Sequence, residues 1–181
     1  MTEWEKLKNG LVYNDFDEEL FQLRVSAKKL FREYNRTGDD ETEKRAILMH
    51  QLFHKVGTNL WIEPDFRCEY GKNISIGNDV YINFGCIILD CANVTIGNNV
   101  LFGPNIGIYV ANHSLDPEER ALGGCFGKPV HISDKVWLGG DVKIVGGVTI
   151  GEGSVIGTGS IVTKSVPAGV VAAGNPCRVI R

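Results

Sequence analysis

Aliphatic side chains recur every six residues through the C-terminal half of the chain. The first position of the repeat is aliphatic in six consecutive units, at Ile132, Leu138, Ile144, Ile150, Ile156 and Val162. Four residues after each stands a small or β-branched side chain, at Val136, Val142, Val148, Ser154, Ser160 and Val166. Glycine, asparagine and aspartate fill many of the positions between, and these residues tolerate the backbone angles of tight turns. An upstream copy of the pattern begins at Ile76 and, after a slip of two residues, begins again at Ile96.

A period of six predicts a β-solenoid. Side chains alternate between the two faces of a strand, so the fifth position of one unit and the first of the next both point inward. The residues between them turn the chain. Three units close a triangular coil of about 18 residues, and successive coils stack at ~4.8 Å. An α-helix would instead require a period of 3.6. The fold class expected is therefore mainly β.

The same register predicts which side chains face outward. The sixth position of each unit lies between two inward positions, and in the second block these residues are Trp137, Lys143, Thr149, Val155, Ile161 and Pro167. Residues 18 apart should stack, so Trp137 should lie next to Val155. Because an exposed apolar wall is uncommon on a monomer, we expect a partner subunit to cover it. Threefold closure suits a triangular prism, which favours a homotrimer.

The first 58 residues follow a helical pattern instead. Apolar residues recur at helical spacing in two runs: Leu20, Leu23, Ala27, Leu30, Phe31 and Tyr34, and then Ala46, Met49, Phe53 and Val56. Gly38 and Gly57 stand where helix ends are expected. The pattern predicts a helical hairpin over residues 1–58, with its apolar stripes packed on the solenoid of residues 59–181.

Residues 112–129 fit no hexapeptide and separate the two blocks of repeats. A stretch of this length without regular structure is usually a functional loop. We therefore expect it to extend outward from a corner of the coil.

Composition excludes several classes of function. The formal net charge of −3 gives no reason to expect nucleic-acid binding. No apolar run approaches the ~18 residues of a membrane span, and the N-terminal residues lack the apolar region of a secretory signal. The five cysteines contain no Cys-x-x-Cys spacing. Unpaired thiols are typical of a reducing compartment, so we expect a cytoplasmic protein.

Several short motifs give the chain a resemblance to a known family. They are Trp61-Ile-Glu-Pro, Tyr81-Ile-Asn-Phe, Asn112-His113, Val136-Trp-Leu-Gly-Gly and the tail from Ile161 to Arg178. Together with the helical N-terminus and the repeats, they resemble the maltose and galactoside O-acetyltransferases. The resemblance implies a left-handed parallel β-helix that moves an acetyl group from acetyl-CoA to a sugar hydroxyl. It also implies a trimer whose active sites lie between neighbouring subunits, with the N-terminal segment contributing to the acceptor site.

His113 is the candidate catalytic base. A sugar hydroxyl attacks a thioester well only when a base removes its proton, and histidine suits that role near neutral pH. His113 lies in the extruded loop and matches the catalytic histidine of the family, which implies direct attack without an acyl-enzyme or a metal. His50 and His54 have a spacing that can bind metal but no evident third ligand, so we interpret them as a surface pair. His131 is interpreted as structural or solvated.

Other positions match family residues around the acetyl group and the CoA. Asn83 matches a residue beside both substrates, although an ordinary turn asparagine remains an alternative. A backbone N–H near Gly140 matches the donor to the developing oxyanion, although the Gly139-Gly140 pair also suits a plain turn. The full set of expected CoA-binding residues is Asn83, Gly140, Thr158, Thr163, Lys164, Arg178 and Arg181.

The acceptor site is implied by the same resemblance. Its expected residues are Asp15, Arg24, Glu69, Tyr81, Asn83, Cys91 and Cys125. Cys91 stands where the galactoside branch has an acidic contact, and a thiol is a weak hydrogen-bond partner. Maltose, glucose, a galactoside or another hydroxylated acceptor therefore all remain open.

Three other functions need separate sequence features. A γ-type carbonic anhydrase needs a zinc site of three histidines, but only His113 and His131 lie in or near the solenoid. An acetyltransferase acting on a xenobiotic remains an alternative, although Asp15 and Arg24 favour sugars. A non-enzymatic scaffold would not be expected to carry His113, Asn83 and Lys164 together.

Overall fold

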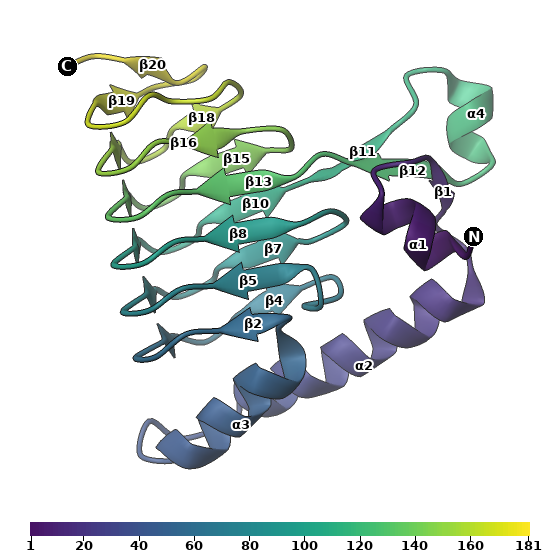
Figure 1. Cartoon of the computed structure of the whole chain (residues 1–181), viewed down its shortest axis with the longest axis horizontal. Helices are drawn as coiled ribbons and strands as arrows, with labels where there is room; N and C mark the ends of the chain where they lie inside the picture. Colours follow the sequence, from purple (N-terminus) through teal and green to yellow (C-terminus); the bar gives the residue numbers. More distant parts are fainter.

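The computed structural model describes all residues, 1–181, and contains a triangular solenoid built from three parallel sheets (Figure 1). The first sheet contains β2 (Lys55–Val56), β5 (Ile74–Ile76), β8 (Val94–Ile96), β13 (Val130–Ile132) and β16 (Thr149–Ile150). The second contains β4 (Arg67–Cys68), β7 (Ile87–Leu89), β10 (Gly107–Tyr109), β15 (Lys143–Val145) and β18 (Ile161–Val162). The third contains β3 (Trp61–Ile62), β6 (Tyr81–Ile82), β9 (Leu101–Phe102), β14 (Trp137–Leu138), β17 (Val155–Ile156), β19 (Val171–Ala173) and β20 (Arg178–Val179), with only β20 antiparallel to its neighbour.

The hexapeptide register predicted from the sequence is confirmed. Trp137 pairs with Val155 and Lys143 pairs with Ile161, so the later coils repeat every 18 residues. The earlier coils repeat every 20 residues, as the pairing of Tyr81 with Leu101 shows. The two extra residues explain the slip that the sequence shows between its upstream repeats.

Burial follows the predicted alternation. All twelve inward positions of the second block are buried, including Ser154 and Ser160, which are fully enclosed. Ser154 Oγ donates a hydrogen bond to the carbonyl of Pro167 at 2.6 Å, so the buried hydroxyl is satisfied. None of the six outward positions is buried, and Trp137 is 54% exposed.

Helices cover the first coil, and in Figure 1 they lie below β2. They are α2 (Glu18–Tyr34) and α3 (Thr42–Leu52), preceded by the short α1 (Glu3–Lys8). The hairpin was predicted correctly, but its ends were not. Helix α2 ends at the cap Asn35 rather than near Gly38, and α3 ends at Leu52 because the chain then enters β2. The first solenoid strand therefore begins slightly upstream of the boundary expected at residue 58.

A buried cation, Arg45, helps to fix the helices to the solenoid. The Arg45 guanidinium lies 4.7 Å from the Tyr34 ring centre and 4.5 Å from that of Trp61. It also donates a 2.6 Å hydrogen bond to the carbonyl of Ile62. This desolvated charge is therefore stabilised by two aromatic faces and by a backbone acceptor.

The segment 112–129 extends from a corner, as predicted, but it is not structureless. Strand β11 (Ala111–His113) leads to the short helix α4 (Pro117–Ala121), and β12 (Gly124–Gly127) returns antiparallel to β11. These elements are too short to show a six-residue or a helical period in the sequence. None of the helices combines the length and apolar character needed to cross a bilayer.

Candidate active site

A small antiparallel sheet joins the N-terminal segment to the extruded loop. Its order is β1 (Tyr13–Asn14), then β12, then β11. Cys125 in the central strand pairs with Tyr13 on one side and with His113 on the other. Strand β12 passes so close to the solenoid that a Cβ at Gly127 would overlap the carbonyl of Cys91. This pairing brings residues far apart in sequence to one place.

His113 is exposed at the end of β11, where its Nδ1 lies 3.3 Å from the carbonyl of Gly124. A carbonyl only accepts hydrogen bonds, so a neutral imidazole in this contact carries its proton on Nδ1. The lone pair then resides on Nε2, which is left to accept a proton from a substrate. The geometry is therefore compatible with a general base.

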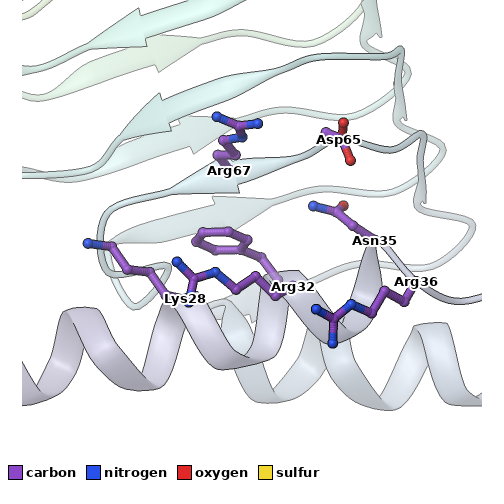
Figure 2. Close-up of a pocket in the computed structure, with 7 residues that line it drawn as sticks. Lys28, Arg32, Asn35, Arg36, Asp65 and Arg67 are labelled. Carbon is purple, nitrogen blue, oxygen red and sulfur yellow. The ribbon is translucent and has the colours of Figure 1, made fainter.

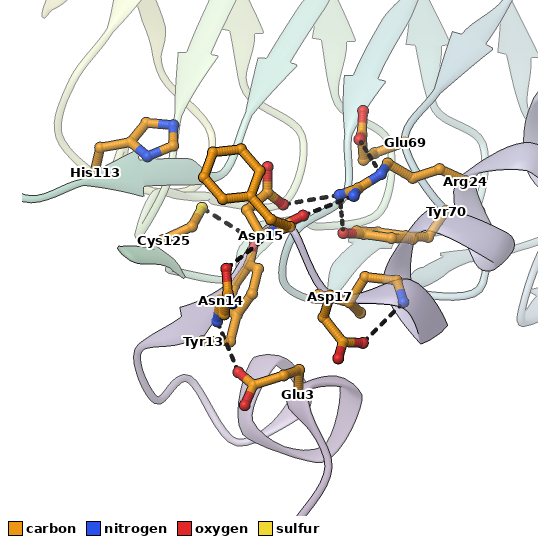
Figure 3. Close-up of polar contacts among 12 residues, drawn as sticks. Glu3, Tyr13, Asn14, Asp15, Asp17, Arg24, Glu69, Tyr70, His113 and Cys125 are labelled. Atoms are coloured by element: carbon orange, nitrogen blue, oxygen red, sulfur yellow. Dashed lines mark hydrogen bonds and ion pairs between the residues drawn. The ribbon is translucent and has the colours of Figure 1, made fainter. Parts of the chain in front are cut away.

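Four residues, Asp15, Arg24, Glu69 and Tyr70, form what we call the acceptor cluster (Figure 3). Arg24 Nη1 donates to Asp15 Oδ1 at 2.8 Å and to the Tyr70 hydroxyl at 3.0 Å, and Nη2 donates to the Asp15 carbonyl at 2.7 Å. Arg24 Nε lies 3.7 Å from Glu69 Oε1. The cluster thus fixes one cation and two carboxylates beside the small sheet.

Burial decides the electrostatics of this cluster. Desolvation raises the pKa of Glu69, opposed by the nearby Arg24 charge, and it also raises the pKa of the Tyr70 hydroxyl. Asp90, fully enclosed at the same corner, accepts backbone hydrogen bonds from Glu69 at 3.0 Å and from Tyr70 at 2.8 Å. Asp90 therefore positions the backbone of two members of the cluster, Glu69 and Tyr70, from the interior of the protein.

Cys91 and Cys125, both expected to contact the acceptor, are buried. The Tyr13 hydroxyl donates to Cys125 Sγ at 3.1 Å, and Tyr13 itself is only 1% exposed. Burial raises the pKa of both thiols, so they remain protonated near neutral pH. Tyr13 and Tyr70 were missed by sequence reasoning, because neither stands in a motif and their partners lie in distant segments.

The other expected residues lie on two different edges of the prism. Between the third and second sheets, the corner that we call the glycine edge carries Asn83, Gly140 and Thr158, each following a strand of the third sheet. Between the second and first sheets, the corner that we call the loop edge carries the extruded loop and Thr163-Lys164. In Figure 1 the loop leaves the solenoid on the right, whereas β19 of the third sheet lies on the left. One chain alone does not bring Asn83 to His113.

Tyr81 follows the same division. It lies on β6 of the third sheet, where its hydroxyl donates to Glu63 Oε1 at 3.2 Å. The Asn83 side-chain oxygen accepts a 2.8 Å bond from the Phe84 N–H, which leaves its amide NH₂ without a partner in the chain. Neither residue contacts the acceptor cluster of its own chain.

The exposed corner amides fit a ligand that accepts hydrogen bonds. The backbone N–H groups of Gly140, Thr158 and Lys164 donate no hydrogen bond to the backbone of the chain. At the C-terminal end, Arg178 Nη1 donates to its neighbouring carbonyl at 2.8 Å, and Arg181 is exposed. These groups present donors and positive charge of the kind that a phosphorylated amide such as CoA requires. No group of three or more His, Cys, Asp or Glu side chains is arranged to hold a metal ion.

Comparison with known proteins identifies the family. Residues 6–57 match the maltose acetyltransferase hexapeptide capping motif, and residues 129–164 match the bacterial transferase hexapeptide of six repeats. The chain is 46% identical to a galactoside O-acetyltransferase of Escherichia coli, covering 98% of this chain and 87% of that protein.

Two solved structures have the same fold over the whole chain. A maltose O-acetyltransferase from Clostridium difficile 630 is 48% identical to this chain. The match covers 100% of this chain and 97% of that one, with a TM-score of 0.98. A hexapeptide-repeat acetyltransferase from Vibrio cholerae, complexed with acetyl coenzyme A, is 39% identical with coverages of 100% and 98% and a TM-score of 0.92. The chain is an acetyltransferase and belongs to the maltose and galactoside O-acetyltransferases.

Proposed function

We propose that this enzyme transfers the acetyl group of acetyl-CoA to a hydroxyl of a sugar, with His113 as the general base. The contact between His113 Nδ1 and the Gly124 carbonyl is the observation that carries the proposal. It fixes the ring and leaves Nε2 as the acceptor of a proton. A similar structure that holds acetyl coenzyme A supports the choice of donor.

The reaction needs no further reactant. The acceptor hydroxyl oxygen attacks the thioester carbonyl carbon while Nε2 of His113 removes the hydroxyl proton. The new C–O bond forms as the C–S bond breaks, and His113 returns the proton to the departing thiolate. The free Gly140 N–H is the donor that stabilises the negative charge developing on the carbonyl oxygen.

The acceptor cluster supports a sugar as the acceptor. Asp15 and Glu69 provide carboxylate oxygens that accept from hydroxyls, and Arg24 provides donors. A polyhydroxylated substrate uses both kinds of group. Because the Cys91 thiol is buried and protonated, the cluster lacks an ionised contact there, so the proposal extends to maltose, glucose or a galactoside without preference.

The division between the two edges supports a trimer. Asn83, Gly140 and Thr158 lie on the glycine edge, whereas His113 and Lys164 belong to the loop edge. If the glycine edge of one subunit lies against the loop edge of its neighbour, one complete site forms at each of three contacts. Such a head-to-tail contact closes into a ring of three.

The outer face of the third sheet supports the same assembly. Its column of outward residues is mostly apolar: Trp61, Tyr81, Leu101, Trp137, Val155 and Val171. Leu101 is 51% exposed and Trp137 54% exposed in the single chain. A neighbouring subunit would remove this surface from water.

An acetylation assay tests the proposal. Free thiol released from acetyl-CoA is measured with maltose, glucose and a galactoside, for the wild type and for His113→Ala. The variant should lose about 10²–10⁴-fold in kcat, the usual contribution of a general base, with the circular dichroism spectrum unchanged. His131→Ala, at an exposed histidine on β13, is the matched control and should retain activity. Full turnover by His113→Ala, or turnover only with non-sugar acceptors, would contradict the proposal.

A further inference from the structure

A basic cavity lies between α2 and the turn that leads into β4 (Figure 2). Its volume is about 530 Å³. The charged and polar residues that line it are Lys28, Arg32, Asn35, Arg36, Asp65 and Arg67. None of them belongs to the sites described above.

The charge of this lining is opposite to that of the whole chain. Four cations face a single carboxylate, Asp65, whereas the chain has a formal net charge of −3. None of the four cations lies within ion-pair distance of an acidic group, Asp65 included. An adjoining groove adds one cation and one carboxylate, Lys29 and Glu33, so it leaves the balance unchanged.

This arrangement is unfavourable without a counter-ion. Lys28 and Arg32 lie four residues apart on α2, a spacing at which like charges destabilise a helix, and Arg36 follows just beyond the helix end. Arg67 adds a fourth positive charge from the neighbouring strand. A bound anion would relieve the repulsion among all four.

The walls of the cavity are held rigidly. The Asn35 amide forms two hydrogen bonds with Phe66: its Nδ2 donates to the Phe66 carbonyl at 2.9 Å, and its Oδ1 accepts from the Phe66 N–H at 3.0 Å. Phe66 is buried and packs edge-on against Phe53, with ring centres 5.5 Å apart. The end of α2 and the start of β4 are therefore fixed relative to each other, so the backbone positions that carry Arg32, Arg36 and Arg67 are set before any ligand arrives.

We propose that this cavity binds the phosphate group of a small molecule, either inorganic diphosphate or a phosphorylated sugar. Planar guanidinium groups bind phosphate oxygens in pairs, and three of the four cations are arginines. A multiply charged phosphate matches the surplus of three positive charges better than a single carboxylate does. Asp65 distinguishes the two ligands, because a carboxylate accepts from a sugar hydroxyl but repels a second phosphate.

Titration calorimetry tests the site directly, without an activity readout. Inorganic diphosphate and glucose 6-phosphate are each titrated into the wild-type protein at 0.15 M salt with saturating CoA present. One ligand should bind per chain. Arg67→Gln and Arg32→Gln should each weaken that binding about tenfold or more, the contribution of one charge-assisted contact. The matched control is Lys29→Gln, which removes a positive charge from the same helix outside the cavity and should leave the affinity unchanged.

Each result decides the proposal. Preference for glucose 6-phosphate that is lost in Asp65→Asn supports a phosphorylated sugar, and preference for diphosphate supports the inorganic anion. Absence of binding, or equal weakening by Lys29→Gln, would overturn the site. Binding that appears only without CoA would also overturn it, because the phosphate would then occupy the CoA site. None of these outcomes depends on whether His113 acts as the base.

Discussion

Arg24 binds Asp15 twice, through Nη1 to the carboxylate at 2.8 Å and through Nη2 to the backbone carbonyl at 2.7 Å. The same guanidinium reaches the Tyr70 hydroxyl, so one side chain from α2 orders three groups of the acceptor cluster. A lysine in its place provides a single charged nitrogen and cannot hold all three partners.

We therefore expect Arg24→Lys and Asp15→Ala to weaken acceptor binding. The KM for the sugar should rise about tenfold or more, and the KM for acetyl-CoA should stay within about twofold. Steady-state kinetics with each substrate varied in turn measures the split. Lys29→Arg, at an exposed position on the same helix but away from the cluster, is the control. A shift in the acetyl-CoA KM alone would show that the cluster is not the acceptor site.

Lys164 should have the reverse effect. It lies on the loop edge, where its exposed ammonium is available to a phosphate of CoA. In Lys164→Ala the KM for acetyl-CoA should rise about tenfold with the sugar KM nearly unchanged. Lys135→Ala is the matched control, because Lys135 pairs with Glu152 on the surface at 2.8 Å. An unchanged acetyl-CoA KM would remove Lys164 from the cofactor site.

A charge on the outer face of the third sheet should break the trimer. Val155 lies beside Trp137 in the apolar column, and an aspartate there would be desolvated by a neighbouring subunit. Val155→Asp should lower the mass measured by light scattering and reduce activity in parallel, because the proposed trimer shares each site between two subunits. Ile47→Asp, at a 57% exposed position on α3, should do neither. A monomeric wild type, or a trimeric and fully active Val155→Asp, would refute this assembly.

Glu69 should make stability depend on pH. Burial raises its pKa above the ordinary 4.5, so the folded chain holds this proton to a higher pH than the unfolded chain does. At pH values between the pKa of Glu69 in the unfolded chain and its raised pKa in the folded chain, unfolding releases a proton. The contribution of Glu69 to stability therefore falls as pH rises. Glu69→Gln removes this loss. Its urea midpoint relative to the wild type should therefore increase from pH 4 to pH 7, whereas Glu33→Gln at an exposed site should show no such trend.

Removal of the Asp90 carboxylate should lower stability substantially. Its carboxylate accepts from the N–H groups of Glu69, Tyr70 and Asn73, and it is fully enclosed. Asp90→Ala leaves these donors without a partner, so the free energy of unfolding should fall by about 2–5 kcal/mol. The exposed Asp40→Ala should change it by less than about 0.5 kcal/mol. Equal urea midpoints for the two variants would contradict this assignment.

The sequence predicted the solenoid well because its information is local. Each coil repeats the alternation of inward residues such as Ile144 and outward residues such as Lys143, and pairing with the next coil needs nothing from farther along the chain. The same locality revealed which segment, 112–129, departs from the repeat. Helix ends were less well predicted, because α2 ends at Asn35, whose side chain is bonded to the backbone of Phe66, and a contact across 31 residues leaves no local signal.

The site was predicted less completely because it depends on distant contacts. His113, Asp15 and Arg24 were named through their resemblance to a family, and their geometry came only with the structure. Tyr13 and Tyr70 had no signal, since aromatic residues at such positions are usually core. The burial of Cys91 and Cys125 was also hidden, because it depends on how β1 packs across β12.

The small sheet that carries His113 has a consequence for the order in which the chain can fold. Parallel solenoid strands pair with partners 16 to 36 residues away, whereas Tyr13 meets Cys125 across a separation of 112 residues. Closing that long loop costs more chain entropy than adding another coil, and it requires a finished corner at Gly127 to pack against. The coils can therefore form progressively, while His113 and the acceptor cluster meet only after most of the chain is in place.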